Sequence, residues 1–244
     1  MIKLLALLLS GVKLGKLFST GGTMLISVVM YSFVFGWRYA VGFVAMLFIH
    51  EMGHFLAARQ RGLQAGLPMF IPFVGAWTTL KDVPHNAETD AYIAMGGPLL
   101  GTVAALVCYF VARNENSSLL LAIAYSGFFL NLINLLPLMP FDGGHITQVI
   151  SPWLWAAGVP LLGLLIWWNQ SPVLFMIAIL AGMQLWSAWK HRHDPQLQAY
   201  RIASMETRIG YATCYIALVG FLGIMAHDVH EMLRAPMVSP SGTV

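Results

Sequence analysis

The chain has 244 residues, of which 58% are hydrophobic and only 9% are charged, with 13 Lys and Arg against 10 Asp and Glu. Soluble domains carry about 25% charged residues, so this composition excludes a soluble globular protein and predicts an integral membrane protein. The basic residues are scattered between apolar runs rather than gathered into one patch, so we expect no nucleic-acid partner.

The first 19 residues are predicted to form an amphipathic helix that lies on the membrane surface. An apolar run over residues 4–9 falls opposite a helical face that carries Lys3, Lys13 and Lys16. A signal peptide is the alternative, but the early lysines and the lack of an A-x-A cleavage site disfavour it.

Seven apolar segments follow, and each is predicted to be a helix. They cover residues 20–36, 39–58, 91–112, 118–137, 153–168, 172–189 and 209–226. Because a straight span needs about 20 residues, the expected fold is an all-α polytopic membrane protein with about six to seven transmembrane helices. With the N-terminus inside, the 13 basic residues divide ten to three between inner and outer segments, and the positive-inside rule predicts a cytoplasmic N-terminus.

Residues 63–80 are apolar but are not predicted to be a helix. Pro68 and Pro72 would break one, and Gly66 and Gly75 mark turns. Extended pieces rich in Phe, Val, Trp and Thr predict a small membrane-associated β-hairpin or sheet. It should pack against the helices near the cytoplasmic face, because non-helical backbone at membrane depth needs cover. A plain interfacial loop is the alternative.

The HEMGH sequence at residues 50–54 places ionisable side chains inside an apolar segment, where they are costly. On a helix, His50 and His54 are one turn apart on the same face, so both rings can reach one Zn²⁺. Glu51 lies beside them and can act as general base on a metal-bound water. The motif therefore predicts a zinc hydrolase site within the bundle.

A catalytic zinc needs a third protein ligand, and Asp142 is the candidate. Pro137 and Pro140 must end or kink the preceding apolar segment, and the Gly143–Gly144 pair is predicted to form a flexible turn. This geometry brings Asp142 back toward the bundle at the depth of the two histidines. His145 is a further candidate that we expect to lie behind the ligands or in solvent.

These motifs resemble the site-2 protease family of intramembrane zinc metalloproteases. The residues that carry the resemblance are HEMGH at 50–54, FIPFVGA at 70–76, Gly97-Pro98, Gly127 with Asn131, and Asn134-x-x-Pro137 followed by Asp142-Gly143. The resemblance implies that the zinc ligands are His50, His54 and Asp142 and that the catalytic base is Glu51. It also implies that Asn134, with Asn131, holds the substrate backbone or the oxyanion.

The resemblance implies cleavage of peptide bonds within or near transmembrane segments of membrane-anchored regulatory proteins. The expected partners are thus a transmembrane protein substrate and the lipid bilayer, and the expected location is a bacterial cytoplasmic membrane with the active site toward the cytoplasm. Many members add a PDZ domain or a CBS pair. Neither fits the apolar segments here, so we expect substrate selection without such a domain.

Two other functions remain open. A membrane-anchored zinc peptidase that acts on soluble or misfolded proteins would need a sizeable polar domain. A zinc-binding or transport protein without protease activity would use Glu51 as a ligand or structural group rather than as a base.

The predicted organisation has four parts: a surface segment at 1–19, a catalytic transmembrane core at 20–150 with the hairpin at 63–80, C-terminal transmembrane helices at 151–230, and a polar tail at 231–244.

Overall fold

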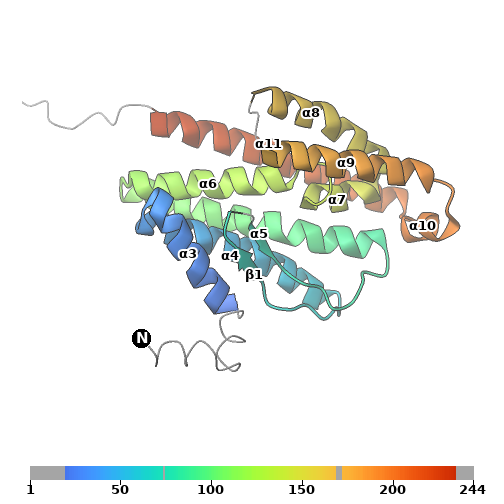
Figure 1. Cartoon of the computed structure of the whole chain (residues 1–244), viewed down its shortest axis with the longest axis horizontal. Helices are drawn as coiled ribbons and strands as arrows, with labels where there is room; N and C mark the ends of the chain where they lie inside the picture. The colour runs from blue at the N-terminus through green and yellow to red at the C-terminus, as the bar shows by residue number, and fades with distance from the viewer. Residues whose placement is uncertain (1–19, 74, 169–171, 235–244) are drawn as a thin grey trace, which may run out of the picture.

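The structure, a computed structural model, describes residues 20–73, 75–168 and 172–234. Within these residues it is a bundle of helices with one small antiparallel sheet (Figure 1). The long helices are α3 (Thr20–Phe35), α4 (Trp37–Gln60), α5 (Ala87–Asn114), α6 (Ser118–Asn134), α8 (Trp155–Trp168), α9 (Pro172–Lys190) and α11 (Met205–Arg234). The shorter elements are β1 (Met69–Ile71), β2 (Gly75–Trp77), α7 (Asp142–Ile150), η1 (Pro152–Leu154) and α10 (Pro195–Tyr200).

Each of the seven predicted apolar segments overlaps one long helix, so the mostly helical fold is confirmed. The helices α4, α5 and α11 are long and apolar enough to cross a membrane, whereas α3, α6, α8 and α9 are apolar but shorter. The 16 residues of α3, for example, reach about 24 Å at 1.5 Å per residue, against a hydrocarbon core of about 30 Å. The number of spans therefore stays a prediction.

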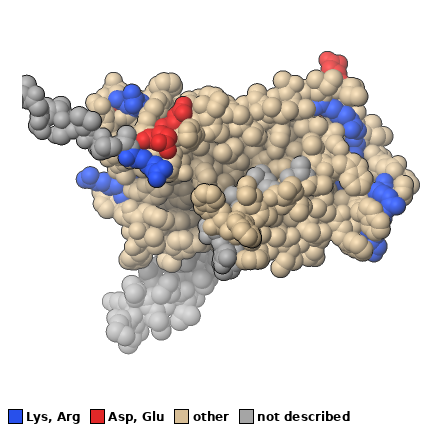
Figure 2. All heavy atoms as spheres, turned by 90° about the horizontal axis from the view of Figure 1, so that it is seen from above, with Lys and Arg blue, Asp and Glu red and all other residues tan. Residues whose placement is uncertain are grey.

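The outer surface of the bundle is apolar, as expected of an integral membrane protein. Phe33 and Trp167 expose 81% and 85% of their surface, a state that water disfavours and lipid does not. Figure 2 shows Lys, Arg, Asp and Glu gathered toward the two ends of the long axis, with an uncharged belt between them. This pattern matches a bundle that crosses a bilayer along its long axis.

The structure describes little of the two predicted end segments, 1–19 and 231–244. The surface segment at 1–19 lies outside the described residues. Residues 231–234 of the predicted tail belong to α11, whose last turn carries an ion pair between Glu231 and Arg234 at 3.8 Å. The rest of the predicted tail again lies outside the described residues. The division of the chain into four parts stays a prediction.

Helix α5 is the centre of the bundle. It packs against α4, α6 and α7, and α11 covers α6 and α7. Small residues on α4 and α5 let the two backbones approach closely: a Cβ at Gly53 or at Gly96 would overlap the main chain of the other glycine. This close approach brings the middle of α4, and with it the HEMGH turn, against the middle of α5.

The predicted β-hairpin is present. β1 and β2 pair antiparallel with Phe70 opposite Ala76, and an isolated bridge joins Ala65 to Leu80. The hairpin docks on α3 and α4: the Phe70 amide donates to Thr23 Oγ1 of α3 at 3.2 Å, and β2 contacts α4. The alternative of a plain interfacial loop is therefore wrong, because cross-strand pairing satisfies the backbone groups that a loop would leave open.

The connection from α6 to α7 brings Asp142 back to the bundle, as predicted, but the Gly143–Gly144 pair is not a flexible turn. Both glycines are buried in the first turn of α7, and a Cβ at either would overlap the preceding backbone, Leu135 or Leu138. The glycines are thus needed for close packing. Tyr215 on α11 fixes the same connection by donating a hydrogen bond to the Leu135 carbonyl.

Candidate metal centre

Three of the predicted site residues meet where α4 and α7 approach each other. The Nε2 atoms of His50 and His54 lie 3.1 Å apart. Asp142, the first residue of α7, faces both: its Oδ2 is 3.2 Å from His50 Nε2, and its Oδ1 is 3.3 Å from His54 Nε2. Two nitrogens and two carboxylate oxygens therefore point at one small volume, the arrangement of a three-residue metal site.

The far side of each imidazole ring is fixed by an acceptor. His54 Nδ1 lies 2.9 Å from the Ile93 carbonyl, and His50 Nδ1 lies 2.8 Å from Asn131 Oδ1. A carbonyl can only accept, so Nδ1 carries the proton in each ring and the Nε2 lone pair is free. Two lone pairs that face each other at 3.1 Å beside a carboxylate repel in the absence of a cation and fit the donor set of a Zn²⁺ ion.

The Asp142 carboxylate also fits a metal ligand. Its Oδ2 atom is buried without a hydrogen-bond partner among the described residues. An ionised carboxylate with an oxygen free of hydrogen bonds is the form in which an aspartate coordinates a cation.

Glycine on α5 makes room for the centre. A Cβ at Gly97 would overlap Nε2 of both His54 and His50, and a Cβ at Gly101 would overlap the Asn131 side-chain amide. The two glycines lie one turn apart, so they form a flat strip on α5 against which the rings rest. The Gly97-Pro98 pair noted in the sequence thus serves the metal centre directly.

Glu51 lies beside the ligands, and the hairpin holds its carboxylate. His50, Glu51 and His54 each offer a ligand atom within 4.8 Å of the other two. Thr78, which directly follows β2, donates a hydrogen bond from Oγ1 to Glu51 Oε2 at 2.8 Å and approaches the Glu51 carbonyl at 3.3 Å. Thr78 could not be predicted as a site residue, because nothing in the sequence indicates how the hairpin docks on α4.

The two predicted substrate-binding residues occupy different environments. Asn131 is only 1% exposed, and its amide binds His50 through Oδ1 and the Gly127 carbonyl through Nδ2. These are the contacts of a residue that orients a ligand ring. Asn134 is half-buried and donates Nδ2 to the Leu130 carbonyl at 3.1 Å. A role for either residue in substrate binding stays a prediction.

His145 is not brought into the ligand cluster. Its Nδ1 lies 2.8 Å from Asp90 Oδ2, and Gln148 Nε2 donates to the same oxygen at 2.5 Å. These contacts tie one turn of α7 to the first turn of α5. His145 thus joins the two helices that carry Asp142 and Gly97, which is the supporting position that the sequence favours for it.

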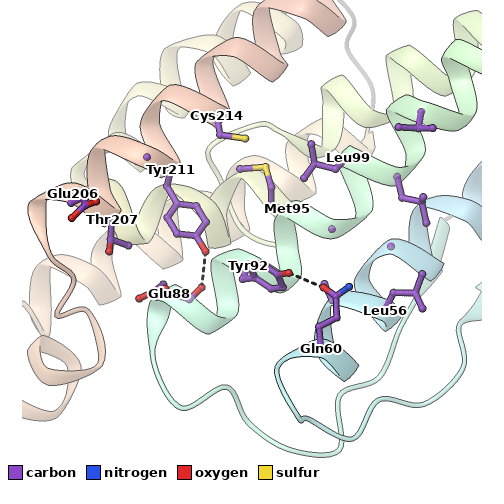
Figure 3. A pocket seen from close by; sticks show the side chains of 16 residues that line it. Leu56, Gln60, Glu88, Tyr92, Met95, Leu99, Glu206, Thr207, Tyr211 and Cys214 are labelled. Atoms are coloured by element: carbon purple, nitrogen blue, oxygen red, sulfur yellow. Dashed lines mark hydrogen bonds between the residues drawn. The ribbon is translucent and has the colours of Figure 1, made fainter.

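A cavity that none of the predicted site residues lines measures about 840 Å³ and is bounded by α4, α5 and α11. Figure 3 shows its polar groups together at one end, where Tyr92 donates to Gln60 and Tyr211 donates to the Glu88 carbonyl. Leu99 and Cys214 lie toward the other end (Figure 3), and Gly53 and Gly96 also line the cavity.

Comparison with known proteins finds a peptidase family and several zinc metalloproteases. Residues 38–116, which are 79 of the 244 residues, match the family model "Peptidase family M50". This match contains His50, Glu51 and His54 and ends before Asp142. The curated relatives are zinc metalloproteases by name, as follows.

Probable zinc metalloprotease EGY2, chloroplastic, of Arabidopsis thaliana is 26% identical over 170 residues, which cover 49% of this chain and 30% of that protein. Zinc metalloprotease MJ0392 of Methanocaldococcus jannaschii is 30% identical over 107 residues, 42% of this chain and 31% of that protein. Putative zinc metalloprotease MJ0611 of the same organism is 28% identical over 174 residues, 58% of this chain and 90% of that protein. The chain thus spans less than a third of the length of the first two.

Among solved structures, the Site-2 Protease from Methanocaldococcus jannaschii aligns with 74% of this chain and 87% of its own, at 19% identity and a TM-score of 0.43. The match over residues 38–116 includes the helix that bears the HEMGH motif. The resemblance that the motifs indicate is therefore confirmed: residues 38–116 match the model of peptidase family M50, and the curated relatives are named as zinc metalloproteases.

Proposed function

We propose that the chain is a zinc-dependent endopeptidase that hydrolyses peptide bonds within or near transmembrane segments of membrane-anchored proteins. The observation that carries the proposal is the convergence of His50, His54 and Asp142, with both histidine rings fixed from behind. The relatives named as zinc metalloproteases support zinc as the metal. The uncharged belt on the face that Figure 2 shows supports a substrate that lies in the bilayer.

In this proposal His50, His54 and Asp142 would hold zinc, which would supply a Lewis acid beside Glu51. Glu51 would accept a proton from the attacking water and pass it to the leaving amine of the substrate. Thr78 holds the Glu51 carboxylate in place. Asn131 and the Ile93 carbonyl keep the rings of His50 and His54 oriented.

A transmembrane helix hides its carbonyls in its own hydrogen bonds, so a substrate must unwind before cleavage. We propose that the unwound segment adds as a strand to the edge of the small sheet. The position of Thr78 supports this idea, since the residue next to β2 contacts the proposed base. The active site faces the cytoplasm in this proposal, and the membrane is a bacterial inner membrane.

The test of this function is cleavage of a membrane-embedded peptide by the purified chain in detergent or vesicles. We expect cleavage of a single-span peptide that contains helix-destabilising residues, with no cleavage of a soluble peptide of the same polar sequence. The chelator o-phenanthroline should stop cleavage, its non-chelating isomer m-phenanthroline should not, and added Zn²⁺ should restore it. Cleavage that survives full removal of the metal would rule the proposal out.

The contact between Thr78 and Glu51 leads to a separate prediction. Thr78→Val keeps the shape of the side chain but removes the hydroxyl that binds Glu51 Oε2. We expect the cleavage rate to fall about 10- to 100-fold, as for groups that orient a metal site from outside its ligands, with unchanged zinc content and little change in KM.

Two further variants test the cause of that loss. Thr78→Ser restores the hydroxyl and should recover most of the rate. Thr79→Val changes the exposed neighbour, for which the described contacts include no side-chain hydrogen bond, and should behave as the unmodified chain. Equal rates for Thr78→Val and Thr79→Val would show that the hydroxyl does not act on Glu51.

A further inference from the structure

A second group of charged side chains lies where the end of α9, α10 and the start of α11 come together. Three arginines line a cavity of about 270 Å³ there, namely Arg192, Arg201 and Arg208. They come from the loop after α9, the residue after α10, and the first turn of α11. None of the predicted metal-site residues lines this cavity, so the three cations have no part in the proposed peptidase chemistry.

The three guanidinium groups have no acidic partner among the described residues, whose ion pairs all involve other side chains. Backbone carbonyls take up some of their donors: Arg192 Nη1 donates to Trp189 at 2.8 Å, and Arg208 Nη1 donates to Ile150 at 3.2 Å. Two carboxylates lie near these arginines along the chain: Asp194 accepts from the Gln196 amide as the cap of α10, and Glu206 lines the other cavity, between α4, α5 and α11. The cavity therefore carries an excess of positive charge.

Arg201 is the most constrained of the three. Its Nε atom is buried and has no hydrogen-bond partner among the described residues, and its guanidinium lies 5.4 Å from the centre of the Trp155 ring. Burial lowers the pKa of the Arg201 guanidinium, which reflects the cost of removing an unpaired charge from water. A bound anion would offset this cost, and guanidinium groups are well suited to phosphate oxygens.

The surroundings of the cavity are those of a membrane interface. α9 ends and α11 begins at this end of the bundle (Figure 1). Trp153 and Trp189 expose 65% and 49% of their surface beside the cavity, as tryptophans do at the level of lipid headgroups. Leu185 and Ile202 form an apolar part of the wall. A ligand with a phosphate joined to an apolar body matches this mixture.

We propose that the cavity lined by Arg192, Arg201 and Arg208 is a binding site for the phosphate of an anionic phospholipid headgroup. The guanidinium groups bind the phosphate oxygens, the exposed tryptophans lie at the glycerol level, and the acyl chains leave along the apolar wall. Such a lipid joins α9 to the start of α11, because the three arginines span that connection.

The test uses the purified full-length chain in a neutral detergent, titrated with phosphatidylglycerol, with phosphatidylcholine or with inorganic phosphate. We expect phosphatidylglycerol to raise the melting temperature and to remain bound in native mass spectra, and the other two to do neither. Arg201→Gln should weaken phosphatidylglycerol binding about tenfold, since it removes one charge-assisted contact. Arg192→Gln should weaken it as well; because Arg192 is exposed, this variant keeps its fold if Arg201→Gln does not.

Arg59→Gln is the matched control, because Arg59 is exposed and stacks on Phe55 without lining the cavity. It should bind phosphatidylglycerol as the unmodified chain does. Equal binding by Arg192→Gln and Arg59→Gln would overturn the site. An equal shift with inorganic phosphate would overturn the lipid as its ligand, and an equal shift with phosphatidylcholine would overturn the preference for an anionic headgroup.

Discussion

Replacing Glu51 with glutamine is expected to lower the rate of peptide cleavage about 100- to 10,000-fold, the range attributed to a positioned general base. Glutamine has the same shape, and its Oε1 can still accept the hydrogen bond from Thr78 Oγ1. It cannot take a proton from water. His50, His54 and Asp142 are untouched, so the zinc content should stay at the level of the unmodified chain.

The measurement pairs cleavage of a membrane-embedded peptide with the zinc content per chain by plasma mass spectrometry. Glu206→Gln is the matched control, because Glu206 is exposed in the first turn of α11 and lies outside the metal centre. A Glu51→Gln chain that cleaves at the native rate would show that the proposed mechanism is wrong. A chain that loses its zinc as well would make Glu51 a ligand, as the metal-transport alternative requires.

Replacing Asp142 with alanine is expected to remove zinc and with it the cleavage activity. The geometry alone carries this prediction, because the match to peptidase family M50 ends at residue 116. The Asp142 carboxylate lies 3.2 and 3.3 Å from the two Nε2 atoms and leaves the site with two protein ligands when it is removed. Loss of a residue that merely orients a ligand costs about 10- to 100-fold in affinity, so loss of the ligand itself should cost at least about 100-fold.

Zinc affinity is measured by competition with a chelator of known strength, and the melting temperature is measured with and without zinc. The unmodified chain should gain stability from zinc, because the metal binds only the folded site; Asp142→Ala should gain much less. Asp228→Ala, which changes an exposed carboxylate near the end of α11, should behave as the unmodified chain. Native zinc affinity in Asp142→Ala would assign the third ligand to another residue.

The positions of the long helices along the chain could be predicted because they depend on local composition alone. In lipid, each spanning segment must satisfy its own backbone and present apolar side chains all round, so the long apolar runs along the chain coincide with α3 to α6, α8, α9 and α11. The short helices α7 and α10 contain no such run, so hydrophobicity does not predict them as separate helices. Their formation depends on contacts with residues far along the chain.

The metal centre was also predictable only in part. His50 and His54 were predictable as a pair because four residues make one helical turn, a local relation. Asp142 could be chosen because carboxylates are rare in the apolar core, and its approach to the rings agrees with that choice. The acceptors behind the rings, the Ile93 carbonyl and Asn131, could not be predicted, since any helix passing nearby offers similar groups.

By itself, the sequence determined that this is a helical membrane protein with a metal-binding helix turn, because hydrophobicity and helical spacing are local properties of the chain. Only the tertiary structure decided that Gly97 leaves room for the two rings, that Thr78 reaches Glu51 from the hairpin, and that three arginines share one cavity. Each of these contacts joins segments that are distant in sequence. Their distances depend on how the helices pack, and packing is a property of the whole bundle rather than of any one segment.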